Sequence, residues 1–265
     1  MSQLFLTNQN DSYAATISST DIFALNGADL VSVTGGGNKI FGGNGDDALL
    51  AFGGNNELDG GNGNDYLRSS IVNSTSAIPG VHLVANANVM LGGNGEDFFV
   101  STGLYASGAF GTGADITGGR GDDTYWFRQS SDILSTDMPL RLTGTPIADG
   151  DTLHGVFDVV NGYKAGEAVD VGTTTPDSDG PEIGVINYIA NHSHVVVDDG
   201  TYAFVQGDLT GDGVFEVSDE GADTLLIYES DPIGEFYDEY SGSVVFIGVA
   251  DSSQINIVST GYALA

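Results

Sequence analysis

A large apolar side chain recurs every nine residues between Ala24 and Arg68, and a stretch rich in glycine and polar residues separates each one from the next. Each of these residues is the middle one of a three-residue run that precedes the next glycine-rich stretch. Such a run predicts a very short strand that directs one side chain into a narrow core. Strict internal periodicity of this kind is typical of stacked repeat architectures. The recurring apolar residues are Val31, Ile40, Leu49, Leu58 and Leu67.

Glycine and polar residues fill the stretches between the apolar positions. Every nonapeptide in this span has glycine at its fourth position, and two of the five begin with a glycine pair, as in GGNGDDALL (42–50). Glycine tolerates the positive φ angles of tight turns, so these stretches predict turns between short strands. The turn residues that are candidates for a metal site are Gly27, Gly42, Asn44, Gly45, Gly60, Asn62, Gly63, Gly92, Asn94, Gly95, Gly118, Arg120 and Gly121.

The sixth position of the nonapeptide alternates between aspartate and asparagine. Two nonapeptides close one coil of a stacked fold, so the sixth position returns to the same edge once per coil. The alternation therefore predicts two chemically different edges of one object. One edge carries Asp29, Asp47, Asp65, Asp97 and Asp123, and the opposite edge carries Asn38, Asn56 and Asn88.

The aspartate edge is electrostatically unfavourable without cations. Stacked strands lie about 4.8 Å apart, and two carboxylates at that spacing repel by roughly 0.9 kcal/mol even in water. The available ligands are carboxylate and turn carbonyl oxygens, a set that suits Ca²⁺, which takes about 6–8 oxygens in flexible geometry. We therefore expect calcium ions between the aspartate rungs. The asparagine edge predicts either a neutral amide ladder or weaker oxygen ligands.

Four nonapeptides, GGNGDDALL, GGNGNDYLR, GGNGEDFFV and GGRGDDTYW, resemble the GGxGxDxUx repeats of RTX proteins, in which U is a large apolar residue. The resemblance covers residues 24–127. It implies a parallel β-roll with two nonapeptides per coil and Ca²⁺ between the turns. It also implies export through bacterial type I secretion machinery, directed by a C-terminal signal. We expect no N-terminal signal in such a protein, and the sequence opens without a basic and apolar leader.

The chain divides into three parts. Residues 1–23 predict a capping strand, residues 24–127 predict the roll with an inserted loop at 69–82, and residues 128–265 predict an all-β C-terminal region. Short alternating apolar runs separated by glycine, aspartate and proline make this last region a β-sandwich or meander. Two of its segments, 156–171 and 201–231, resemble regions that follow the repeats in secreted RTX-type surface proteins. The predicted fold class is therefore all-β, a parallel β-roll followed by a sandwich or meander.

A second candidate calcium site lies between residues 208 and 219. Its residues approximate the spacing of a 12-residue calcium loop, with glycine at the sixth position and an apolar residue at the eighth. The flanking runs favour strands over helices, so a solvated acidic hairpin loop is the alternative. The candidate ligands are Asp208, Thr210, Asp212, Glu216 and Asp219.

Composition limits the classes of function. The chain has Lys+Arg 6 against Asp+Glu 37, a net charge of −31, which argues against nucleic acid or an anionic membrane surface as a partner. Cysteine is absent, which excludes disulfides and thiolate metal sites. No apolar run is long enough to predict a membrane span.

These features predict a secreted, extracellular protein of the bacterial cell surface, structural in role, whose folding is driven by calcium. An adhesin, or a module that binds cell-surface or extracellular polysaccharide, is an alternative. A polysaccharide-active enzyme is a third hypothesis. Because the sequence contains neither H-E-x-x-H nor G-x-S-x-G, we expect no catalytic site.

Overall fold

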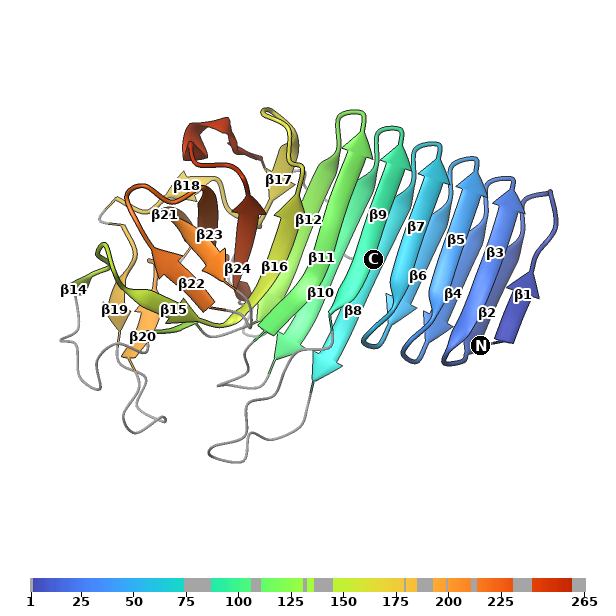
Figure 1. The fold of residues 1–265 in the computed structure, drawn as a ribbon, viewed down its shortest axis with the longest axis horizontal. Coiled ribbons are helices and arrows are strands. Elements are labelled where there is room, and N and C mark those ends of the chain that lie inside the picture. Colours follow the sequence, from blue (N-terminus) through green and yellow to red (C-terminus); the bar gives the residue numbers. More distant parts are fainter. Residues whose placement is uncertain are drawn as a thin grey trace.

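The computed structural model describes residues 2–73, 87–105, 111–130, 133–135, 145–178, 180–184, 193–198, 200–210, 214–230 and 240–258. The described residues form β-strands and one 3₁₀ turn, Ser252–Gln254, without an α-helix. The predicted all-β class is confirmed, and the first half of the chain is a parallel roll (Figure 1). None of the described segments is a helix of the length and apolarity needed to cross a membrane.

Two parallel sheets form the roll, and the chain passes from one to the other at every turn. One sheet contains β1 (Ser2–Phe5), β3 (Thr20–Asn26), β5 (Lys39–Asn44), β7 (Glu57–Asn62), β9 (Asn88–Asn94) and β11 (Gly111–Arg120). The other contains β2 (Ser12–Thr16), β4 (Leu30–Thr34), β6 (Ala48–Phe52), β8 (Tyr66–Asn73), β10 (Phe98–Tyr105) and β12 (Thr124–Ser130). Ile22 pairs with Ile40, and Ile40 with Leu58, so two nonapeptides make one coil.

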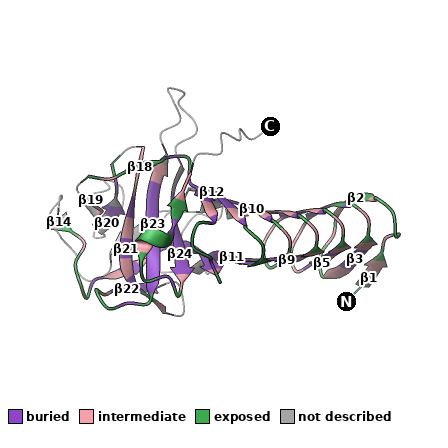
Figure 2. Ribbon diagram, turned by 90° about the horizontal axis from the view of Figure 1, so that it is seen from above, coloured by how far each residue is buried: buried purple, intermediate pink, exposed green. Residues whose placement is uncertain are grey.

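Apolar side chains fill the narrow space between the two sheets: one row from each sheet runs along the roll, and residues such as Ala24, Val33 and Ala51 are buried beside these rows. Both rows are fully buried, and their members occupy the eighth position of the nonapeptide. Figure 2, a view from above, shows the two sheets as thin layers that face each other. The rows are Ile22, Ile40, Leu58, Met90 and Ile116 in one sheet, and Val31, Leu49, Leu67, Phe99 and Tyr125 in the other.

The roll begins earlier than the sequence analysis expects. β1 pairs in parallel with β3, and β2 pairs in parallel with β4, in the register of the later coils. Residues 1–23 therefore contain a first coil and the start of β3, where a single capping strand was expected. This coil lacks the glycine pair that marks the later repeats, since Leu6 and Thr7 occupy those positions.

The prediction of an inserted loop at residues 69–82 is wrong at its start. Ser69 and Ser70 continue β8 and pair with Ser101 and Thr102 of β10. The described part of β8 ends at Asn73, and residues 74–86 lie outside the described ranges.

Parallel pairing continues past residue 127. The strands β16 (Val156–Asn161) and β17 (Ala168–Asp170) pair with β11 and β12. The strands β24 (Tyr240–Ile247) and β25 (Asn256–Ile257) then pair with β16 and β17. The predicted boundary at 127 is thus a change in sequence pattern, because the stacked structure continues beyond it.

A largely antiparallel region packs against this end of the roll and forms the broader block in Figure 2. It has a second core, which includes Leu153, Phe157, Phe215, Leu225 and Val245. Its remaining strands are β13 (Ile133–Ser135), β14 (Thr145–Pro146), β15 (Thr152–His154), β18 (Thr175–Pro176), β19 (Glu182–Gly184), β20 (Ser193–Val196), β21 (Thr201–Thr210), β22 (Val214–Val217) and β23 (Asp223–Ser230).

Candidate metal centre

The predicted aspartate edge is present, and its five aspartates are 1–2% exposed. Each lies in a turn that leads from a strand of the first sheet to a strand of the second. These turns form the upper edge of the roll in Figure 1. The fold therefore stacks five buried carboxyl groups in one row: Asp29, Asp47, Asp65, Asp97 and Asp123.

One carboxylate oxygen of each aspartate binds the neighbouring rung. The amide of Asp29 donates to Oδ1 of Asp47 at 2.8 Å, and the amide of Asp47 donates to Oδ1 of Asp65 at 2.8 Å. The pattern continues to Asp123, whose Oδ1 accepts the amide of Asp97 at 3.0 Å. These bonds fix the side-chain orientation along the whole row.

The second oxygen, Oδ2, is buried without a hydrogen-bond partner in all five aspartates. A buried polar atom without a donor costs roughly 1–3 kcal/mol, and more if it is charged. Glycine at the first position keeps side chains away from this oxygen, since a Cβ on Gly42 would collide with Oδ2 of Asp47. The same holds for Gly60, Gly92 and Gly118 and the aspartates that follow them.

The fourth-position glycines direct backbone oxygens along the same edge. Gly45 has a φ of 121° and Gly63 a φ of 132°, angles that other residues rarely adopt. A Cβ on Gly45 would overlap the carbonyl oxygen of Gly27, so each of these carbonyls points toward the next rung. At the third position, the carbonyl of Asn44 accepts the amide of Gly27 at 2.9 Å.

Burial raises the pKa of the aspartate carboxyls above the ordinary value. The pKa of Asp47 is raised to about 6, that of Asp65 to about 7 and that of Asp97 to about 6. Desolvation is the largest cause in each case; repulsion from neighbouring acidic groups adds to it, and the hydrogen bond from the adjacent rung opposes it. The edge therefore favours a proton or another cation beside its carboxylates.

The side chains of the asparagine edge use both terminal atoms in hydrogen bonds, whereas those of the aspartate edge use only Oδ1. The amide nitrogen of Asn38 donates to Oδ1 of Asn56 at 3.0 Å, in the same pattern as the aspartates. The Nδ2 atom of Asn56 donates to the carbonyls of Gly35 at 3.0 Å and Gly53 at 3.1 Å. Of the two predicted alternatives for this edge, the structure has the neutral amide ladder.

The third-position asparagines form another ladder, on the outside of the turns. Nδ2 of Asn62 donates to Oδ1 of Asn44 at 3.0 Å, and Nδ2 of Asn94 donates to Oδ1 of Asn62 at 2.9 Å. These side chains bind one another, so their contribution to a cation would be the backbone carbonyl. Arg120 holds the same position in the last repeat and is exposed.

The predicted calcium loop at residues 208–219 is a β-hairpin in the structure, which is the alternative given above. Asp208 lies opposite Glu216, and Thr210 lies opposite Val214. Oδ1 of Asp208 accepts the amide of Ala222 at 2.9 Å. Asp208, Thr210 and Glu216 therefore lie on two paired strands, and calcium binding by this stretch stays a prediction. Asp212 lies outside the described residues, and Asp219 follows β22.

Within the described ranges, no three histidine, aspartate or glutamate side chains meet at one point. A cation at the aspartate edge would therefore use the carboxylates of two neighbouring rungs and complete its coordination with turn carbonyls. Such a set of hard oxygen donors matches calcium better than a transition metal.

Two acidic residues extend the aspartate row beyond the predicted five. The amide of Asp11 donates to Oδ1 of Asp29 at 2.7 Å, which places Asp11 one rung earlier. Glu167 follows at the other end, because the amide of Ala168 donates to the carbonyl of Asp123 at 3.2 Å, as Thr124 does to Asp97. The 18-residue spacing to Asp29 could have revealed Asp11, whereas no glycine pair marks Glu167.

Comparisons of the chain with protein-family models, with curated proteins and with solved structures give no match.

Proposed function

We propose that this chain is a calcium-binding β-roll protein of the RTX type, with Ca²⁺ ions between neighbouring aspartate rungs. The observation that carries the proposal is the row of five buried Oδ2 atoms without donors. The first-position glycines beside four of them leave space that a side chain would fill. We call the space between the aspartates of two neighbouring rungs a gap. A cation in each gap would supply the missing partner and cancel the repulsion between the two carboxylates.

The residues of one gap illustrate the proposed coordination. Asp47 and Asp65 each offer Oδ2, and the turns around Gly45 and Gly63 offer carbonyl oxygens. All these donors are oxygen atoms, and the turns belong to a flexible glycine-rich backbone. Ca²⁺ accepts variable oxygen geometry, whereas Mg²⁺ requires a near-ideal octahedron and keeps its water.

Binding of calcium to the folded roll would couple metal concentration to folding. An ion that binds only the native state stabilises it by about 1.4 kcal/mol per site when its concentration is ten times the dissociation constant. Without the ion, the unpartnered carboxylates and the net charge of −31 oppose the compact state. The roll would be less stable where calcium is scarce and more stable where calcium is plentiful.

This coupling suits a structural surface protein that leaves a bacterium by type I secretion and folds outside the cell. Extracellular calcium modules bind at roughly 10⁻⁴–10⁻³ M, close to the concentrations they meet. The asparagine edge would remain free of metal, because its side chains already accept from the neighbouring rung and donate to turn carbonyls.

A calcium titration followed by circular dichroism tests this function. Protein treated with chelator should gain β-structure as Ca²⁺ is added, and the same concentration of Mg²⁺ should produce a smaller gain. A spectrum and a melting temperature that do not respond to Ca²⁺ would contradict the proposal.

A further inference from the structure

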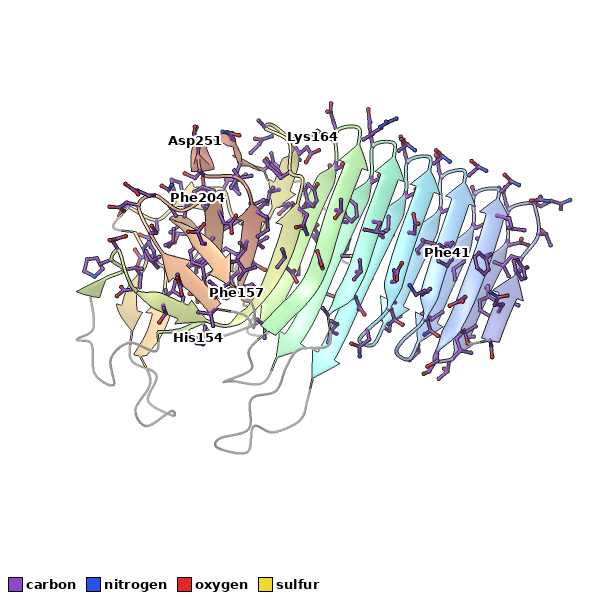
Figure 3. The ribbon with its side chains drawn as sticks, viewed as in Figure 1. Phe41, His154, Phe157, Lys164, Phe204 and Asp251 are labelled. Atoms are coloured by element: carbon purple, nitrogen blue, oxygen red, sulfur yellow. The ribbon has the colours of Figure 1, made fainter. Side chains whose placement is uncertain are left out.

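The aspartate row ends at a lysine ammonium group. Nζ of Lys164 donates to the carbonyl of Gly121 at 2.7 Å and to Oε1 of Glu167 at 3.1 Å, and it lies 3.8 Å from Oδ2 of Asp123. Gly121 and Asp123 hold the fourth and sixth positions of the last glycine-rich repeat. Figure 3 shows Lys164 at the turn edge of the roll, beside the end of this row of turns.

The oxygens around this ammonium group match those offered by every earlier gap in the row. They comprise a fourth-position carbonyl, the Oδ2 atom of the aspartate on one rung and a carboxylate oxygen from the next rung, which here is Glu167. The amide of Ala168 donates to the carbonyl of Asp123, so Glu167 occupies the sixth position of its coil. The positive charge of Lys164 therefore lies in the gap that follows the last aspartate.

Hydrogen bonds hold the Glu167 carboxylate beside the Lys164 ammonium group, which also lies near Asp123. It is 4% exposed, its Oε2 accepts the amide of Lys164 at 3.0 Å, and the same oxygen accepts the hydroxyl of Tyr125 at 3.1 Å. Lys164 thus bridges two carboxylates that would otherwise face each other without a counter-charge.

We infer that Lys164 is a built-in cation that takes the place of a metal ion in the final gap of the aspartate row. This inference rests on the proposed function and adds a stoichiometry to it. The row binds calcium only in the four gaps between Asp29 and Asp123. At the opposite end, Oδ2 of Asp11 accepts the amide and the hydroxyl of Thr7, both at 2.7 Å, so the chain's own donors close that end as well.

The inference predicts that removal of the ammonium group opens a new calcium site. Lys164→Met should bind one more Ca²⁺ ion than the wild-type protein, as measured by equilibrium dialysis with radioactive calcium. In chelator, amide hydrogen exchange of residues 164–168 should accelerate on the order of tenfold, and calcium should restore protection. Lys39→Met is the matched control. It removes the same charge from the outer face of the roll, where Lys39 pairs with Glu57, and should leave the stoichiometry unchanged.

Equal numbers of bound ions in Lys164→Met and Lys39→Met would overturn the inference, whatever the exchange data show. A Lys164→Met protein that stays unfolded at saturating calcium would also overturn it, because calcium should replace the lost ammonium. Lys164→Arg keeps a cation and should bind as many ions as the wild type; an additional ion would count against the proposal. Failure of the proposed function would appear differently, as a wild-type protein that binds no calcium.

Discussion

The amide nitrogen of Asp47 donates a hydrogen bond to Oδ1 of Asp65, which lies 2.8 Å away on the next rung of the roll. The amide of Asn56 makes the same 2.8 Å bond to Oδ1 of Asn88 on the opposite edge. The two edges thus share one backbone geometry and differ in the second terminal atom of the side chain, which is Nδ2 in asparagine and Oδ2 in aspartate. Where asparagine has Nδ2 and finds carbonyl acceptors, aspartate has an unpartnered Oδ2.

Exchange of aspartate for asparagine should therefore separate calcium binding from stability. Asp65→Asn removes a buried oxygen that has no hydrogen-bond donor. The free energy of unfolding of this variant in chelator should therefore exceed that of the wild type by about 1 kcal/mol. The same change removes a carboxylate from two gaps, and its calcium affinity should fall. Urea denaturation with and without calcium measures both effects.

Asn56→Asp is the matched variant on the other edge. It loses the Nδ2 bonds to Gly35 and Gly53 and should lower the free energy of unfolding by about 1–3 kcal/mol in chelator. If both variants shift stability in the same direction in chelator, the assigned difference between the edges is wrong.

The stability of the metal-free roll should depend on pH in the opposite sense to most acidic proteins. The pKa values of about 6 for Asp47 and about 7 for Asp65 in the native state lie above the ordinary 3.8. The native state then holds more protons than the unfolded chain between about pH 4 and 7, so stability falls as pH rises through this window.

Urea midpoints of metal-free protein at about pH 5 and pH 7.5 measure this dependence, and the midpoint should be higher at pH 5. Saturating calcium should abolish or reverse the trend, because metal binding displaces the protons. A metal-free protein that gains stability between these two pH values would show that the carboxyls are not desolvated as described.

The close stacking of turns should make fourth-position glycines intolerant of a side chain. Gly45→Ala places a Cβ against the carbonyl of Gly27 at a positive φ, and it should cost more than about 3 kcal/mol in the free energy of unfolding. Gly162→Ala is the control, since Gly162 also has a positive φ but has nothing within 4 Å of the added Cβ.

The control should cost about 1–2 kcal/mol, the ordinary cost of a left-handed backbone. Thermal melts of both variants in calcium make the comparison. Equal losses would mean that the turns are farther apart than the structure places them.

The nonapeptide repeat predicts the roll well because its physical causes are local. A glycine turn, a short strand and one inward side chain determine each half-coil, so Val31, Ile40 and their equivalents are core residues, as expected. The alternation at the sixth position likewise predicts two different edges, and Asp29 and Asn38 lie on opposite ones.

The glycine repeat alone does not predict every residue of the aspartate row. Glu167 joins the aspartate row through strand pairing with a neighbouring coil, a non-local interaction that the sequence pattern does not mark, whereas the 18-residue spacing to Asp29 does mark Asp11. The stretch at 208–219 is the opposite case, because its local spacing does not determine its backbone arrangement. Its spacing resembles a calcium loop, but pairing of β21 with β22 places Asp208 and Glu216 on a hairpin.

Amide hydrogen exchange along the aspartate edge tests the central claim most directly. The amides of Asp29, Asp47, Asp65 and Asp97 each donate to the next rung, so their protection reports whether the stacked row is intact. At neutral pH these amides should be protected in calcium and should exchange much faster in chelator. Equal protection in chelator and in calcium would contradict the claim that cations hold the aspartate rungs together.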